Sequence, residues 1–121
     1  MYKLIILFGQ PENSLEFVTG WQAFLHMAEQ MPGLRRESVS LIENVIYDGG
    51  KPRPFKIHEF YFDDRAALDA ALASDAGQQA GEWLHQFTNG NFTLLTAPHQ
   101  EATAKEFNKK VTKKKGRARS A

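Results

Sequence analysis

The segment FVTGWQAFLHMAEQMPGL, residues 17–34, decides how this chain folds. At about 100° of rotation per residue, its large apolar side chains fall on one narrow face of a helix and its polar side chains fall on the other. The helix has to end at Pro32-Gly33, because proline cannot continue the hydrogen-bonded ladder and glycine readily adopts a left-handed turn. The segment therefore predicts an amphipathic helix that packs on a flat surface. Its apolar face carries Phe17, Trp21, Phe24, Ala28 and Met31.

Apolar runs on either side of this helix predict a four-stranded sheet. A second helix, which begins at Asp63 or Asp64 and restarts at Ser74-Asp75, separates the last two strands. The order β-α-β-β-α-β is that of the ferredoxin-like α+β fold, in which an antiparallel four-stranded sheet carries both helices on one face. The predicted strands span residues 2–8, 34–47, 55–62 and 92–97.

Apolar residues occupy both faces of the predicted sheet. In the first strand, Leu4, Ile6 and Phe8 point to one face, whereas Ile5 and Leu7 point to the other. The helices can cover only one face, so the second would expose apolar surface unless another sheet covers it. Two sheets packed face to face about a two-fold axis meet this need, and we expect a homodimer.

Charge divides the chain into two parts. Residues 1–99 carry seven basic and twelve acidic residues and are expected to form one domain, whereas residues 100–121 carry eight basic and two acidic residues. The second part has no apolar period, so we expect a basic, disordered tail. Such a tail could bind nucleic acid or anionic lipid non-specifically, but Phe107 is its only aromatic residue for stacking, and we expect a solubilising or incidental tail instead.

The chain has no cysteine, which agrees with a reducing compartment. Its N-terminal apolar run is too short for a signal peptide or a membrane span. No phosphate-binding loop, metal cluster or nucleophile triad is present in the sequence. We therefore expect a cytoplasmic protein, and neither a metal ion nor another cofactor.

Several segments together resemble the EthD family of the dimeric α+β barrel superfamily. They are KLIILF at 3–8, MPGLRR at 31–36, and HEFYFDDRAALDAALASDAGQQAG at 58–81, followed by FTLLTA at 92–97. The resemblance implies a dimeric ferredoxin-like fold with a pocket between helices and sheet for a small hydrophobic or aromatic compound. The positions that match the family's strand end and helix restart are Glu59, Phe62, Asp63, Ser74 and Gly77.

The first helix departs from the family pattern at its histidine. Members of the family carry a histidine eight residues before the proline of the stop, and in this chain that position is Phe24. His26 instead falls where the family has a proline. Helical geometry places Phe24 on the buried side and His26 about 160° away, so we expect His26 to face solvent. A chemical role for His26 would require a gap in the match to the family or a helical irregularity.

The predicted strand 55–62 carries the remaining candidates for chemistry. His58 lies on the strand face that also bears Phe60, where an imidazole is either a satisfied core or interface residue or a general acid or base. Glu59 and Tyr61 share the opposite face. Glu59 is either paired with Arg35 or Arg36 or is a base with a raised pKa. The other two histidines are expected to lie at a helix end (His85) and in solvent (His99).

Aromatic side chains are candidates for the lining of a ligand pocket. They are more typical of a filled core, because aromatic residues at helical spacing dominate core packing. A pocket built from them would select flat apolar ligands and would not suit a charged metabolite. The candidate lining residues are Trp21, Phe24, Phe60 and Trp83.

Two functions remain open. The first is an EthD-like protein that binds a small hydrophobic or aromatic molecule with weak or no catalysis. The alternative is a cofactor-independent enzyme of the oxygenase, decarboxylase, dehydratase or cyclase type, acting on a small aromatic or polyketide-like compound. A closed cavity of roughly 300 Å³ or more, reached by His58 or His26, would favour the enzyme. The candidate catalytic residues are His58, Glu59, Tyr61 and His26.

Overall fold

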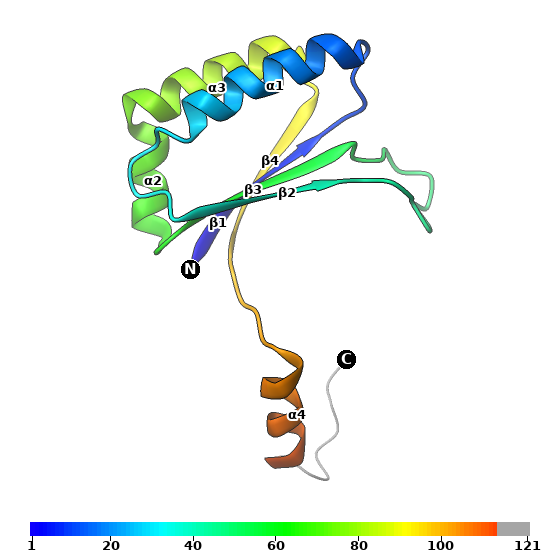
Figure 1. The fold of residues 1–121 in the computed structure, drawn as a ribbon, viewed down its shortest axis with the longest axis vertical. Helices are drawn as coiled ribbons and strands as arrows, with labels where there is room; N and C mark the ends of the chain where they lie inside the picture. The colour runs from blue at the N-terminus through cyan, green and yellow to red at the C-terminus, as the bar shows by residue number, and fades with distance from the viewer. Residues whose placement is uncertain (114–121) are drawn as a thin grey trace.

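The computed structural model describes residues 1–113, which form a four-stranded antiparallel sheet and four helices. The strand order is β2-β3-β1-β4, and α1 and α3 lie side by side on the same side of the sheet (Figure 1). The predicted ferredoxin-like α+β fold is confirmed. The elements are β1 (Tyr2–Phe8), α1 (Ser14–Ala28), β2 (Arg36–Leu41), β3 (Lys56–Phe62), α2 (Arg65–Ala73), α3 (Asp75–Thr88), β4 (Phe92–Pro98) and α4 (Ala104–Lys113).

Short polar side chains begin the three helices that pack on the sheet. Asn13 accepts a hydrogen bond from the N–H of the third residue of α1 at 3.0 Å, and Asp64 does the same for α2 at 2.8 Å. Ser74 closes α2 and accepts from the Gly77 N–H at 3.1 Å, so it also begins α3. Each side chain satisfies a backbone donor that has no partner within its helix. The predicted restart at Ser74 is confirmed.

The second strand is shorter than predicted. β2 ends at Leu41, and residues 42–55 form a loop. The prolines near the end of this loop have no N–H with which to extend the ladder. Asp48 also folds the loop back on itself, because its carboxylate accepts from the Gly50 N–H at 2.7 Å and from Arg53 Nε at 2.9 Å. Beyond Ile42, whose N–H donates to the Phe55 carbonyl at 3.1 Å, no strand is formed in this segment, although the spacing of its apolar residues resembles that of a strand.

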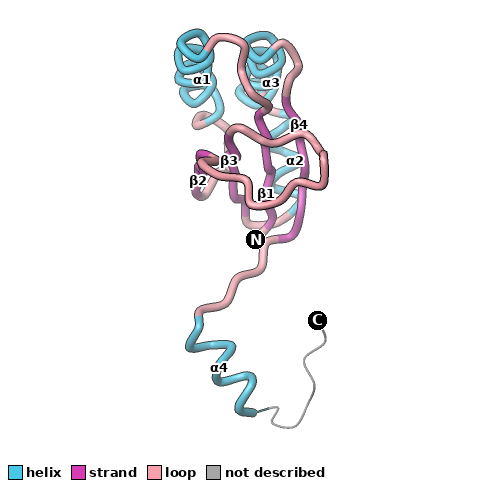
Figure 2. Tube along the Cα trace, turned by 90° about the vertical axis from the view of Figure 1, so that its right-hand side faces the viewer, coloured by secondary structure: helices cyan, strands magenta, loops and turns pink. Residues whose placement is uncertain are grey.

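A helix occupies part of the tail for which we expected disorder. Thr103 Oγ1 accepts from the Glu106 N–H, and Glu106 Oε1 accepts from the Thr103 N–H, both at 3.2 Å. This reciprocal capping box begins α4, which stands apart from the domain in both views (Figures 1 and 2). Residues 114–121 lie outside the described part of the chain. None of the helices in the described part is both long and apolar enough to cross a bilayer.

The two faces of the sheet have different surroundings. On β1, Leu4, Ile6 and Phe8 are buried on the face that the helices cover. The side chains of opposite parity lie on the other face, over which residues 1–113 place no helix (Figure 1). Strand pairing brings the apolar residues of this open face together, because Leu7 lies opposite Ile57 and Ile5 lies opposite Leu95.

Candidate functional site

One side of α1 faces one side of β3, and the candidate site lies between them. Residues two apart in a strand point the same way, so Lys56, His58 and Phe60 share the helix-facing side of β3. Residues three or four apart in a helix are neighbours, which brings Trp21 and Phe24 onto the facing side of α1. The ring centroids of Trp21 and His58 are 5.8 Å apart, and those of Phe24 and Phe60 are 6.2 Å apart. Trp21 on the helix therefore faces His58 on the strand, and Phe24 faces Phe60.

His58 is completely buried in this arrangement. Its Nε2 lies 2.8 Å from Glu37 Oε1, whereas its buried Nδ1 has no hydrogen-bond partner among the described residues. Burial, together with the positive charge of Lys56, lowers the pKa of His58 to about 4, although the negative charge of Glu29 opposes the shift. The imidazole is therefore neutral at pH 7. When its Nε2–H donates to Glu37, its Nδ1 presents a lone pair.

Two carboxyl groups lie between the buried His58 and solvent. Glu37 comes from β2 and its side chain is 27% exposed, while Glu29 caps the C-terminal end of α1 and is exposed. A hydrogen bond with Glu37, followed by burial and by the charge of Glu37, raises the pKa of Glu29. Glu37 thus lies between His58 and Glu29.

Lys56 contributes a buried positive charge to the same space. The residue is 9% exposed, and its Nζ lies 3.4 Å from the centroid of the Trp21 ring and 5.3 Å from that of Phe17. No carboxylate pairs with Lys56 within the described chain. Burial lowers the pKa of its amine. The Trp21 Nε1 atom is buried as well and has no hydrogen-bond partner there.

The sequence predictions omitted Glu37 and Lys56. Lys56 could have been found from its parity, because it lies two residues before His58 and hence on the same strand face. Glu37 depends on how the strands pair. The structure places Val39 opposite His58. Glu37 lies two residues before Val39 on β2, and its side chain extends toward the imidazole. An imperfect alternation over 34–47 does not determine that register.

Glu59 and Tyr61 point to the open face of the sheet, away from His58. Glu59 accepts a hydrogen bond from Lys3 Nζ at 2.7 Å, so its cation partner is Lys3 and not one of the two arginines that we expected. Tyr61 is 5% exposed, and its hydroxyl lies 3.2 Å from Ser38 Oγ. The strand separates this polar group from the His58 site, as the alternation predicted.

The two arginines pair with other carboxylates. Arg35 binds Asp63 through two hydrogen bonds of 2.8 and 3.1 Å, which raises the pKa of Arg35 and lowers that of Asp63. Arg36 binds Glu101 at 3.0 Å and lies over the Tyr61 ring at 4.1 Å. Both pairs are exposed, and neither faces His58.

The other histidines lie outside the site. His26 is exposed on α1, as its position on the helical wheel predicted, and His85 is exposed near the end of α3. The expectation for His99 was wrong. Its side chain is only 15% exposed, its Nε2 lies 2.7 Å from Glu101 Oε1, and its ring packs edge-on against Tyr61 at 4.9 Å. The residues that follow β4 thus contact side chains of the sheet.

The four candidate lining residues have different environments. Phe24 and Phe60 are 3% and 0% exposed and pack within the core around His58, and Trp21 is partly buried above the same ring. Trp83 instead donates its Nε1–H to the Gly20 carbonyl at 2.8 Å and stacks on Phe87. Trp83 thus joins α3 to α1.

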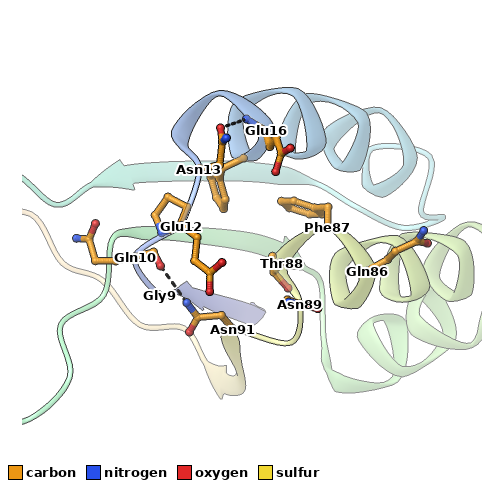
Figure 3. A pocket seen from close by; sticks show the side chains of 12 residues that line it. Gly9, Gln10, Glu12, Asn13, Glu16, Gln86, Phe87, Thr88, Asn89 and Asn91 are labelled. Carbon is orange, nitrogen blue, oxygen red and sulfur yellow. Dashed lines mark hydrogen bonds between the residues drawn. The ribbon is translucent and has the colours of Figure 1, made fainter.

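A separate cavity of about 470 Å³ opens where the chain enters α1 and leaves α3. Figure 3 shows amide and carboxylate side chains around it, and its floor includes the Phe87 ring. Asn91 Nδ2 donates to the Gln10 carbonyl at 3.1 Å, and Asn13 serves the cap of α1. His58 does not line this cavity. Polar side chains line this cavity, and some of them already form hydrogen bonds that stabilise the surrounding loops.

Comparisons with known proteins agree with the geometry of the chain. No family model matches it. An uncharacterised 11.0 kDa protein from the thcB–thcC intergenic region of Rhodococcus erythropolis is 25% identical over 96 residues, which cover 78% of this chain and 91% of that protein. The structure of an EthD family protein from Bacillus halodurans C-125 is 28% identical with a TM-score of 0.75, over 83% of this chain and 99% of that one. The resemblance to the EthD family is confirmed.

More distant structures share the fold of this EthD-like chain. A dimeric ferredoxin-like protein of unknown function from Jannaschia sp. CCS1 is 22% identical with a TM-score of 0.55, over 81% of this chain and 97% of that one. SnoaB, a cofactor-independent oxygenase from Streptomyces nogalater, is 13% identical with a TM-score of 0.62, over 85% of this chain and 96% of that one. At these identities the likeness concerns the fold alone.

In this EthD-like chain the inward position on α1 belongs to a phenyl ring. The resemblance implied a histidine at the position of Phe24, and Phe24 is buried there. The imidazole that faces the same space comes from β3, as His58, and packs edge-on against Phe24 with ring centroids 6.3 Å apart. A titratable ring is thus present between helix and sheet, although a strand supplies it.

Proposed function

We propose that this protein binds a small, flat, largely apolar molecule beside His58, in the space between α1 and β3. One observation carries the proposal: His58 Nδ1 and Trp21 Nε1 are buried without hydrogen-bond partners in the described chain, on rings whose centroids are 5.8 Å apart. Leaving a polar atom buried and unpaired destabilises a protein by about 1–3 kcal/mol. Two such atoms on neighbouring rings favour a site that a ligand completes.

The surroundings of these atoms favour a flat ligand. The surroundings of the imidazole are aromatic and apolar, because Phe60 stacks on His58 at 4.2 Å and Phe24 packs edge-on against it at 6.3 Å. Trp21 is partly exposed, so its ring borders solvent and marks the side from which a ligand would approach. Shape would select the body of the ligand, and the two unpaired atoms would orient it.

A second candidate function is proton-transfer catalysis without a cofactor. The observation that favours it is the 2.8 Å contact between His58 Nε2 and Glu37 Oε1. A carboxylate that accepts the Nε2–H fixes the imidazole tautomer and leaves Nδ1 as a base. His58 would then take a proton from an acidic C–H or O–H group of the bound molecule, and Glu37 would stabilise the resulting imidazolium. SnoaB, which shares the fold, is a cofactor-independent oxygenase.

Thermal stabilisation by aromatic compounds tests the binding proposal, because a ligand of the folded state raises the apparent stability by mass action. We expect a subset of planar compounds to raise the Tm of the wild-type protein. His58→Phe should lose that response, whereas the exposed control variant His26→Gln should keep it. A wild-type protein that no aromatic compound stabilises, or a His58→Phe variant with an unchanged response, would contradict the proposal.

Product analysis separates catalysis from binding alone. If His58 is a base, the wild-type protein should exchange an acidic C–H proton of a bound compound for deuterium in heavy water, which mass spectrometry detects. Glu37→Gln should slow this exchange while binding persists, because the amide cannot stabilise the imidazolium. Binding without exchange for every compound that binds would favour the binding function alone.

We propose, in addition, that two copies of the chain associate through the open faces of their sheets. Support comes from the apolar residues that this face exposes and from the Jannaschia protein of the same fold, which is dimeric. A second sheet would remove these side chains from water. The apolar residues on this face are Ile5, Leu7, Ile57 and Leu95.

A further inference from the structure

We propose that the molecule bound beside His58 is a planar hydroxy-carboxylate, whose carboxylate is held by Lys56 and Trp21 and whose hydroxyl is held by His58. This rests on the binding site proposed above and names the chemistry of its ligand. It departs from the expectation that the pocket would not suit a charged metabolite, because that expectation did not include Lys56.

Lys56 carries a buried charge that has no anionic partner in the described chain. Its amine is surrounded by the rings of Trp21, Phe17 and Phe55, at 3.4, 5.3 and 6.0 Å from Nζ to the ring centroids, and no carboxylate of the described chain pairs with it. A buried lysine is normally paired, since burial of a lone charge is unfavourable. An aromatic face compensates for part of the lost hydration but accepts no N–H hydrogen bond of full strength. A ligand oxygen with negative charge would supply what is missing.

The neighbouring unpaired atoms differ in polarity. Trp21 Nε1–H can only donate, so its partner must be an acceptor, like the partner of Lys56. A carboxylate has two acceptor oxygens and can serve both groups. His58 Nδ1 presents a lone pair while Nε2–H donates to Glu37, so its partner must be a donor. A hydroxyl group on the same molecule fulfils that role.

The spacing of these groups suits one small molecule. Lys56 and His58 are two residues apart on one face of β3, which separates their Cα atoms by about 7 Å. Lys56 Nζ lies 3.4 Å from the centroid of the Trp21 ring, and the Trp21 and His58 centroids are 5.8 Å apart, so one small molecule can carry both its anionic group and its hydroxyl to these residues. A benzene ring that bears the two groups has this form.

The experiment compares two probes that differ in charge and share their shape: 4-hydroxybenzoate and 4-hydroxybenzamide. Isothermal titration calorimetry measures the affinity of each for the wild-type protein, for Lys56→Met and for the control variant Lys51→Met, whose lysine is exposed on the β2–β3 loop. We expect the wild type and Lys51→Met to prefer the anion by about tenfold or more, as a charge-assisted hydrogen bond allows. Lys56→Met should lose this preference and should still bind the amide.

A separate readout identifies a purely structural lysine. If Lys56 is present for an anionic ligand, Lys56→Met should raise the stability of the free protein, because methionine fills similar space without a buried charge. A structural role through Trp21 predicts the opposite change.

Each contrary outcome has its own meaning. Equal binding of the two probes by the wild type, or an anion preference that survives in Lys56→Met, would overturn the assignment of a carboxylate and leave the binding site standing. Loss of 4-hydroxybenzoate binding on addition of salt, with no effect of Lys56→Met, would also overturn it by placing the anion on the surface. Absence of binding by either probe would overturn this assignment, and failure of the wider aromatic series would overturn the binding site itself.

Discussion

His58 is buried as a neutral imidazole, and that fact couples the stability of the protein to pH. The pKa of His58 is about 4 in the folded protein, mainly because burial disfavours the charged form, whereas an unfolded histidine titrates near 6.5. Between these two values the unfolded chain binds more protons than the folded chain. The free energy of unfolding therefore decreases as the pH falls from about 6.5 to about 4.

The variant His58→Gln removes this titration. Between pH 7 and pH 5, His58 should lower the free energy of unfolding of the wild-type protein by about 2 kcal/mol, and His58→Gln should lack that share. Urea denaturation at both pH values measures the difference. His26→Gln is the control and should follow the wild type, because its ring is exposed. Parallel pH dependence in His58→Gln and the wild type would show that His58 does not titrate in this way.

The two tryptophans allow a test of the unpaired indole nitrogen. Trp83 Nε1–H donates to the Gly20 carbonyl at 2.8 Å, whereas the buried Trp21 Nε1 has no partner in the described chain. Trp83→Phe should therefore destabilise the protein by about 1 kcal/mol more than Trp21→Phe does. Chemical denaturation of both variants gives the comparison. An equal loss for both would mean that Trp21 Nε1 has a partner in solution.

Single residues were predictable from the sequence where strand or helix geometry alone decides their direction. The alternation in β3 separated His58 from Glu59, and the helical wheel placed Phe24 inside and His26 outside. Partners were harder to predict, because they depend on strand pairing. Lys3 lies beside Glu59 through the β1–β3 ladder, where Lys3 is opposite Tyr61, and nothing local to Glu59 indicates this.

At the scale of elements, caps and turns were predictable and lengths were not. Asn13, Asp64 and Ser74 each cap the helix that begins at the next residue, so these helix starts could be inferred from local chemistry. The end of β2 at Leu41 depends instead on whether the neighbouring segment can supply hydrogen bonds, and the alternation of apolar residues continues past that point. The capping box at Thr103 was not predicted, because the high charge of the segment that follows led us to expect disorder.

The junction between α2 and α3 depends on a glycine. A Cβ atom at Gly77 would overlap the carbonyl oxygen of Ala71 and would lie 2.9 Å from the Leu72 Cα, both backbone atoms of α2. Gly77→Ala should therefore destabilise the protein by about 1–3 kcal/mol, because the two helices would have to separate. The control lies one turn further along α3, where a Cβ at Gly81 meets nothing within 4 Å.

Gly81→Ala should stabilise the protein by about 0.5–1 kcal/mol, since alanine favours the helix and restricts the unfolded chain. Thermal or urea denaturation of both variants measures the two effects. Opposite signs are expected from the same substitution in one helix. A neutral Gly77→Ala would mean that α2 and α3 move apart without resistance, which would contradict the close approach at Ser74.

At the scale of the whole molecule, the open face of the sheet is the surface through which we propose that two copies associate. The helices cover one face of the sheet. The apolar residues of the other face lie on three neighbouring strands, β3, β1 and β4. The sequence indicated this surface through the two parities of β1, and strand pairing shows that its members adjoin. The proposed site between α1 and β3 lies on the opposite face, so separate substitutions can test the proposed association and the proposed ligand binding.

Two neighbouring leucines of β4 provide the test of association. Leu94 and Leu95 are 49% and 44% exposed and point to opposite faces of the sheet, with Leu95 beside Ile5 on the open face. Leu95→Lys would place a charge within the proposed contact between two sheets, where its desolvation is unfavourable. We expect a dimer for the wild type and for Leu94→Lys, and a monomer or a much weaker dimer for Leu95→Lys, by analytical ultracentrifugation. A monomeric wild type, or equal effects of the two substitutions, would exclude the open face as the interface. Because His58 lies on the other face, monomeric Leu95→Lys should still be stabilised by any compound that stabilises the wild type.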